Sequence, residues 1–239
     1  VRSRRQRQMC IRDSAQAVDL PSKVTATELK RLEAEDAPPE DAGAPLLAGA
    51  PRTQTFRRPD FSARARKLTA AERGTATHRI LQYLHFADAR TPEGIRAQVE
   101  TLTARGELTG REAQAVDTAS LLRLGRTELG AQLAAAEAAG TLRREFRFSL
   151  LCPAETFFPN AGDEQVLLQG VVDCFFEEDG ELVVVDFKTD RIGRTQIEER
   201  AEHYRPQLEA YSMALMRVMG KKVREKVLYF FSVGEEKVL

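Results

Sequence analysis

Two apolar runs separated by an Asp-Gly pair predict a β-hairpin in the second half of the chain. The runs are Gln169–Phe176 and Leu182–Lys188, with Asp179 and Gly180 between them. Asp-Gly is typical of the tight turn in a hairpin because both positions accept a positive φ. If these two residues form the turn, Glu178 faces Glu181, and the register places Asp173 directly opposite Asp186.

Helical periodicity before the hairpin predicts a series of helices. A short helix is expected over 25–34, and a capping box, Thr69-x-x-Glu72, opens a second helix with an apolar stripe of Ile80, Leu81 and Leu84. The segment 111–139 is rich in Ala and Leu and is interrupted by Gly125 and Gly130, which predicts more than one helix.

The remaining elements complete an α/β pattern. Strands are expected over 143–150 and 227–233, and a helix over 204–219, with Pro206 in its first turn and Gly220 at its end. The core face of that helix is predicted to hold Leu208, Tyr211, Leu215 and Val218. The order of helix, strand, hairpin, helix and strand predicts an α/β fold with a mixed sheet flanked by helices, with extra helices inserted before the hairpin.

The net charge of zero hides two different parts of the chain. Residues 1–14 carry five Arg and one Asp, or +4, which leaves 31 basic and 35 acidic residues, or −4, in the remainder. The first 14 residues fit no helix or strand pattern and resemble translated non-coding sequence, with a basic arm for nucleic acid as the alternative. We expect three parts: an extension over 1–22, a helix and basic linker over 23–67, and a main domain over 68–239.

Six basic residues lie in the second half of that linker, between positions 52 and 67 (Arg52, Arg57, Arg58, Arg64, Arg66 and Lys67). They fit either a solvated connector, which we favour, or a strip that follows phosphates. The overall charge alone gives no support for binding to nucleic acid.

Cysteine use and hydropathy exclude several classes of protein. Cys10, Cys152 and Cys174 are odd in number and far apart, which argues against disulfides, a zinc ribbon and an iron–sulfur cluster. A reducing, cytoplasmic setting is therefore expected. No apolar run approaches the roughly 18 residues of a membrane span, so no membrane partner is expected.

The opposed aspartates are the strongest indication of chemistry in the sequence. Like charges directly across a strand pair are destabilising, so Asp173 and Asp186 are expected to share a cation. Lys188 lies two residues after Asp186 and projects from the same face of the strand. Two carboxylates with a further ligand suit Mg²⁺, and an adjacent ammonium group suits phosphodiester hydrolysis. A salt bridge at an exposed strand end is the structural alternative.

Two further elements fit such a site. His78 borders the apolar stripe of the helix that follows Thr69, where a satisfied core histidine is the alternative to a ligand. Gln207 and Tyr211 are four residues apart and share one helix face, where they could grip a nucleotide by hydrogen bonding and stacking. Alone, Tyr211 would be a core residue and Gln207 a surface residue.

Four motifs in order give a specific resemblance: Gly74-x-x-x-His78-x-x-Leu81, Gly170-x-x-Asp173, Asp186-x-Lys188 and Gln207-x-x-x-Tyr211. This pattern resembles the RecB-type nuclease domains of the PD-(D/E)XK superfamily. Within that pattern, the segments VVDFKTDRI, YRPQLEAYSMAL and VREKVLYFF more closely resemble the C-terminal nuclease domains of AddA-type helicase–nuclease subunits. The resemblance spans about residues 25–239 and is strongest from residue 68 onward.

The resemblance implies a role for each of these residues. His78, Asp173, Asp186 and the carbonyl of Phe187 would ligate Mg²⁺, which Mn²⁺ could replace, and Lys188 would be catalytic. Gln207 and Tyr211 would contact DNA or order the site, and Glu145 resembles a further acidic position. The domain would cut one DNA strand emerging from an unwound duplex end during double-strand break repair, beside a second, AddB-like subunit in the bacterial cytoplasm.

Departures from the parent enzymes limit this interpretation. The chain lacks a Gly-x-x-x-x-Gly-Lys-Ser/Thr motif, since Leu215 stands where the first glycine would precede Gly220-Lys221, so no ATP site is expected. The cysteines also do not match relatives that carry an iron–sulfur cluster. The alternatives are a catalytically silent module that binds DNA or docks to the partner subunit, and a stand-alone RecB-family exonuclease.

Overall fold

The computed structural model describes residues 20–32 and 68–239, so the predictions for residues 1–19 and for the linker over 33–67 lie outside the described part. The described residues form a mixed sheet flanked by helices, which confirms the predicted α/β fold. The strands are β1 (Lys23–Thr25), β2 (Arg143–Pro153), β3 (Gln165–Glu178), β4 (Glu181–Lys188), β5 (Val223–Phe230) and β6 (Glu235–Val238). The helices are α1 (Ala26–Leu32), α2 (Ala70–Tyr83), α3 (Pro92–Ala104), α4 (Gly110–Ala115), α5 (Thr118–Arg126), α6 (Glu128–Ala138) and α7 (Ile197–Met219).

The long strand β3 is where the sheet divides. β2 pairs antiparallel with β3 from residue 165 to residue 175. β1 pairs in parallel with residues 167–169 of β3, and β4 pairs antiparallel with residues 174–178. Because a strand has only two edges, β1 and β4 share the edge that β2 leaves open. Residues 170–173 of β3 therefore lie in the gap between β1 and β4.

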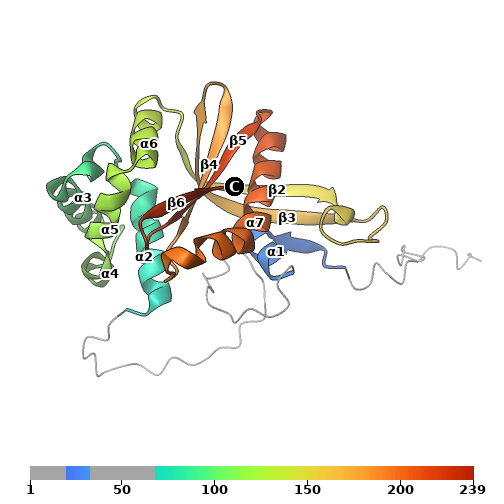
Figure 1. The fold of residues 1–239 in the computed structure, drawn as a ribbon, viewed down its shortest axis with the longest axis horizontal. Helices are drawn as coiled ribbons and strands as arrows, with labels where there is room; N and C mark the ends of the chain where they lie inside the picture. The colour runs from blue at the N-terminus through green and yellow to red at the C-terminus, as the bar shows by residue number, and fades with distance from the viewer. Residues whose placement is uncertain (1–19, 33–67) are drawn as a thin grey trace, which may run out of the picture.

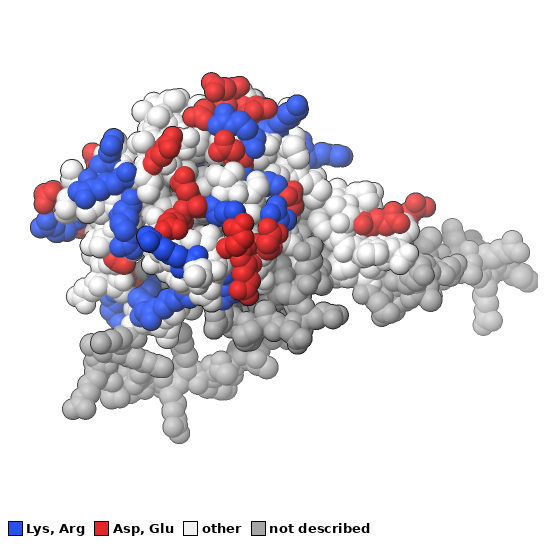
Figure 2. All heavy atoms as spheres, in the orientation of Figure 1, with Lys and Arg blue, Asp and Glu red and all other residues white. Residues whose placement is uncertain are grey.

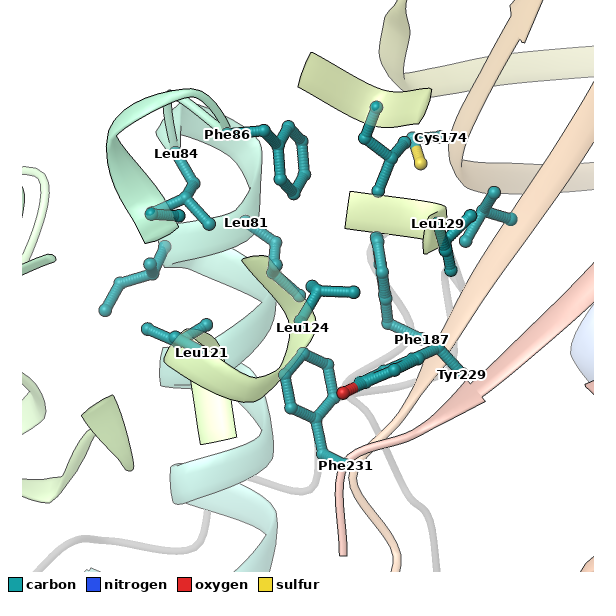
Figure 3. Packing of buried hydrophobic residues seen from close by; sticks show 14 of the residues in the cluster. Leu81, Leu84, Phe86, Leu121, Leu124, Leu129, Cys174, Phe187, Tyr229 and Phe231 are labelled. Carbon is teal, nitrogen blue, oxygen red and sulfur yellow. The ribbon is translucent and has the colours of Figure 1, made fainter. Parts of the chain in front are cut away.

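The helices cover both faces of the sheet (Figure 1). Val183, Val185 and Phe187 of β4 pack with the layer formed by α2 to α6, whereas Leu182 and Val184 pack with the cluster that includes α1 and α7. This alternation is the period of two expected of a strand buried on both faces. Figure 3 shows the first cluster, where Leu81, Phe86 and Leu124 lie opposite Phe187 and Tyr229.

The predicted hairpin is confirmed, including its register. Asp179 and Gly180 both have positive φ, 53° and 84°, as a type I′ turn requires. Glu178 faces Glu181, and Cys174 faces Val185. The ladder ends at this pair, and Asp173 and Asp186 occupy the next positions, beyond the paired residues.

The elements around Pro206 differ from the prediction. α7 begins at Ile197, about two turns before the predicted start, so Pro206 lies inside the helix and not in its first turn. The acidic Glu198 and Glu199 in the first turn favour the earlier start. Val218 is 54% exposed and was wrongly placed on the core face, whereas Gly220 does end the helix with φ 66°. The last predicted strand was also displaced, since β5 runs from Val223 to Phe230.

The inserted helices are separate, as predicted, but the glycines do not divide them. Gly125 lies within α5 and Gly130 within α6, whereas the breaks fall at the N-cap residues Asp117 and Thr127. A Cβ atom on Gly125 would lie 2.3 Å from the Ala89 carbonyl oxygen. This glycine therefore allows α5 to approach the short turn before α3.

The N-terminal segment predicted as a helix contributes a strand as well. Lys23–Thr25 forms β1 in the main sheet, and α1 follows it and contacts α7. Thus the described part of the segment packs on the same sheet as residues 68–239. In the part of the chain that the structure describes, no helix is long and apolar enough to cross a membrane.

Candidate active site

The two aspartates of the hairpin lie together where β3 and β4 separate. Asp173 and Asp186 are the first pair beyond the ladder that ends at Cys174 and Val185. The Phe187 N–H donates to Asp173 Oδ2 at 2.9 Å, which ties the two strands at this point. Burial raises the pKa of Asp186, which is 2% exposed, and the neighbouring Asp173 carboxylate acts in the same direction. The two carboxyl groups are therefore close enough for their charges to interact.

Lys188 supplies the positive charge next to this pair. Its Nζ lies 2.7 Å from Asp186 Oδ2 and donates to Gln207 Oε1 at 2.9 Å. The same nitrogen lies 3.8 Å from the centroid of the Tyr204 ring, within cation–π range. An ammonium group that is nine-tenths buried is costly unless it is paired, and here three groups hold it in place.

Gln207 and Tyr211 extend the hydrogen-bond network that begins at Lys188. Gln207 Nε2 donates to the Tyr211 hydroxyl at 2.6 Å, and both side chains are buried. Burial raises the pKa of Tyr211 well above its usual value. Through these contacts, Gln207 holds Lys188 and Tyr211 holds Gln207. Ordering the site in this way is one of the two roles expected of the pair. Binding of DNA by this pair stays a prediction.

His78 reaches the site from α2, which begins at the predicted capping box formed by Thr69 and Glu72. His78 Nδ1 lies 3.4 Å from Asp173 Oδ1. Gly74, one turn earlier, lets α2 approach the end of β4, because a Cβ there would lie 2.7 Å from Thr189 Oγ1. The histidine thus stands beside the first aspartate, as the sequence predicted.

The pKa of His78 reflects this contact with Asp173. Burial, the largest single cause, lowers the pKa of the imidazole, but the charge of Asp173, the hydrogen bond to Asp173 and the charge of Asp186 together outweigh it and raise the pKa to about 9. Burial also acts against the charged form of Asp173, yet His78 and the Phe187 N–H hold the pKa of that carboxyl below its usual value. The pair is therefore ionic at neutral pH.

This ion pair predicts that stability falls as the pH rises. The pKa of His78 is 6.5 in the absence of interactions and about 9 in the folded protein, so the stabilisation is complete below pH 6.5 and is lost as the pH passes 9. In a chelating buffer, urea unfolding should give a loss of about 1–2 kcal/mol between these values, less than the full shift implies because the side chain is 33% exposed. His78→Gln should flatten this dependence, and an unchanged slope in that variant would contradict the assignment.

Glu145 of β2 and Asp173 of β3 occupy the opposed positions between the pairs Arg144–Cys174 and Phe146–Val172. The φ of Glu145 is 50°, a strained conformation for a residue with a long side chain in a strand. Burial raises the pKa of Glu145, and its charge interacts with those of Asp173 and His78. The structure thus places Glu145 beside Asp173 and His78. Strained backbone of this kind is common in functional sites.

Arg200, Tyr204 and Asp190 also belong to this region and were not predicted from the sequence. Successive members of the set Arg200, Tyr204, Gln207 and Tyr211 are four, three and four residues apart, so the four side chains form one stripe along α7. Tyr204 contacts Lys188, and Arg200 Nε lies 3.9 Å from Asp190 Oδ2. Asp190 follows Lys188 by two residues, so the stripe runs beside the end of β4. The spacing alone could have indicated this stripe.

The donor atoms at the site fit a hard divalent cation. Carboxylates, a backbone carbonyl and an imidazole are oxygen and nitrogen ligands that such cations accept. The buried Asp186 Oδ2 already has the Lys188 ammonium at 2.7 Å. Within residues 20–32 and 68–239, no three His, Cys, Asp or Glu side chains are gathered closely enough to hold a metal ion. His78 and Lys188 instead neutralise one aspartate each.

Comparison with known proteins gives the family to which this fold belongs. The chain belongs to the PD-(D/E)XK nuclease superfamily, whose family model matches residues 52–238. Nucleases of this superfamily generally use divalent metal ions.

Curated relatives place the chain more closely within the superfamily. It is 37% identical over 221 residues to AddA, the ATP-dependent helicase/nuclease protein of Desulforudis audaxviator, in an alignment that covers 91% of this chain and 18% of that protein. The AddA proteins of Acetivibrio thermocellus and Thermoanaerobacter sp. are 35% and 32% identical, covering 91% and 90% of this chain and 17% of each relative. The chain is thus a nuclease domain homologous to one part of these proteins and spans less than a fifth of their length.

Proposed function

We propose that this chain is the DNA exonuclease domain of a helicase–nuclease of the AddA type, which hydrolyses phosphodiester bonds of one strand during double-strand break repair and recombination. The observation that carries the proposal is the position of Asp173 and Asp186 just beyond the end of the β3–β4 ladder, where their charges interact, together with the ion pair between Asp186 and Lys188. Two carboxylates beside a fixed ammonium group suit the hydrolysis of an anionic ester.

His78, Asp173, Asp186 and the Phe187 carbonyl would hold the metal, with Mg²⁺ as the expected ion and Mn²⁺ as a substitute. When bound, the cation would act as a Lewis acid and lower the pKa of a coordinated water. Lys188 lies next to Asp186 and would stabilise negative charge that develops on the phosphate oxygens. Gln207 and Tyr204 fix the direction of its ammonium group, so that no reorganisation is needed when the charge forms.

Glu145 and the α7 pair complete the proposed assignment. Glu145, facing Asp173, would act as an additional acidic group. Gln207 and Tyr211 would order Lys188 and approach the DNA. The substrate would be a single strand that emerges from an unwound duplex end, and the partner a second, AddB-like subunit. ATP would be hydrolysed by the helicase part of the complex.

Cleavage of single-stranded DNA by the purified chain tests this function. A labelled oligonucleotide should be degraded with Mg²⁺ and left intact with a chelator, and Asp186→Asn should abolish degradation. Asp179→Asn is the matched control, because Asp179 is the exposed turn residue of the same hairpin. Equal activity in the wild type and Asp186→Asn would refute the assignment.

The same assay separates the proposal from its closest rival. A silent DNA-binding or docking module would bind the oligonucleotide without degrading it under any metal condition. The intact set of His78, Asp173, Asp186 and Lys188, with the contacts described above, favours an active enzyme over this module.

A further inference from the structure

Beyond the aspartates, β2 and β3 continue as a two-stranded ribbon whose faces differ in chemistry. On one face, Phe148 and Cys152 of β2 and Val166 and Leu168 of β3 are buried in the cluster that includes α1 and α7. On the other face, the alternate residues of β2 (Arg147, Ser149 and Leu151) are exposed. The ribbon therefore has one open face that begins at the candidate active site.

Arg147 is the first residue on this open face after Glu145. It pairs across the ribbon with Val171, which precedes Asp173 by two residues. A rise of about 3.4 Å per residue places Arg147 about 7 Å along β2 from Glu145. Arg147 is exposed, and its charge acts on the neighbouring Glu145, whose pKa it lowers, without an ion pair or side-chain hydrogen bond between the two. Its guanidinium is thus available to an anion close to the paired carboxylates.

The pair of residues that follows Arg147 is polar and uncharged, and the exposed Leu151 comes after it. Gln169 Nε2 donates to Ser149 Oγ at 2.5 Å, and these two residues form the next pair along the ribbon. Farther out, the turn that joins β2 to β3 carries Glu155, Asp163 and Glu164, and Figure 2 shows acidic side chains at that end. An anionic strand would be attracted at Arg147 and repelled at the tip.

We infer that Arg147 binds a backbone phosphate next to the scissile one, and that the Ser149–Gln169 pair extends this subsite for single-stranded DNA. The inference rests on the proposed function, because it names a surface that would hold the strand for that cleavage. A planar guanidinium matches two phosphate oxygens and makes a sequence-independent contact. Arg147 would be a positioning residue: it would bind a phosphate of the strand and would not touch the reacting atoms.

The binding of fluorescein-labelled oligothymidylate, in a chelating buffer that prevents cleavage, tests the inference. Fluorescence anisotropy should show that Arg147→Ala weakens binding about 5- to 10-fold and reduces the slope of log K against log salt by about 0.7, the value for one phosphate contact on a single strand. Arg147→Lys should retain the slope because it keeps the charge. With Mg²⁺, Arg147→Ala should raise KM far more than it lowers kcat.

Arg217→Ala is the matched control, since Arg217 is an exposed arginine in the last turn of α7, and it should leave both affinity and slope unchanged. If Arg147→Ala binds as the wild type does, or if both variants lose affinity equally, the subsite is disproved while the nuclease function stands. If the wild type neither binds nor cleaves the oligonucleotide, the proposed function and the subsite fail together.

Discussion

Lys188→Met is expected to slow strand cleavage by about 100- to 1,000-fold while leaving DNA binding largely intact. The Lys188 ammonium lies 2.7 Å from Asp186 and is held by Gln207 and Tyr204, so its charge is fixed in a buried site. Methionine has a similar length but no charge. Single-turnover cleavage with Mg²⁺ measures the loss directly, because it reports the chemical step without product release.

Lys222→Met is the control for this substitution, since Lys222 is exposed in the short connection between α7 and β5. It should cleave at the wild-type rate. Removal of one partner from a buried ion pair also destabilises a protein, so the folded fraction of Lys188→Met is measured by urea unfolding before rates are compared. A folded Lys188→Met protein that cleaves at the wild-type rate would contradict the role of this lysine.

Gln207→Leu should reduce both stability and activity, because it removes the residue that links Lys188 to Tyr211. Gln207 accepts from Lys188 and donates to the Tyr211 hydroxyl, and all three side chains are buried. The substitution leaves a buried charge with one partner fewer, which costs about 1–3 kcal/mol. We expect a shift of that size in urea unfolding and a loss of about 10-fold or more in the cleavage rate.

Tyr211→Phe separates the two hydrogen bonds of Gln207. It removes the contact with Tyr211 and leaves the contact with Lys188, so its effect on cleavage should be clearly smaller than that of Gln207→Leu. If Tyr211→Phe lowers the rate as much as Gln207→Leu while both proteins remain folded, Tyr211 itself meets the substrate. That result would support the predicted contact of Tyr211 with DNA.

The hairpin and its register were predictable because few arrangements satisfy the local rules. A two-residue Asp-Gly turn fixes every opposed pair, so the positions of Asp173 and Asp186 follow by counting. The start of α2 followed in the same way from one capping box, which sets the position of His78. In both cases, the information lies within a few residues of the turn or cap.

The first half of α7 and the strain at Glu145 could not be predicted from periodicity. Residues 197–206 are mostly polar because one side of the helix faces charged groups of the site, so the apolar pattern of a helix is missing there. Tyr204 and Arg200 were missed for this reason, although their spacing from Gln207 and Tyr211 could have indicated them. The left-handed backbone at Glu145 depends on the meeting of β2 with the gap in the sheet beside Asp173, which no local sequence signal reports.

Titration of Mn²⁺ into the purified chain by calorimetry tests most directly whether the two opposed carboxylates share one ion. We predict binding in the wild type, a loss of at least 10-fold in affinity for Asp173→Asn and for Asp186→Asn, and a double variant that loses little more than either single one, because both remove ligands of the same ion. Asp163→Asn, on the exposed turn after β2, should bind as the wild type does. Wild-type affinity in either single variant would show that these carboxylates do not share a metal ion.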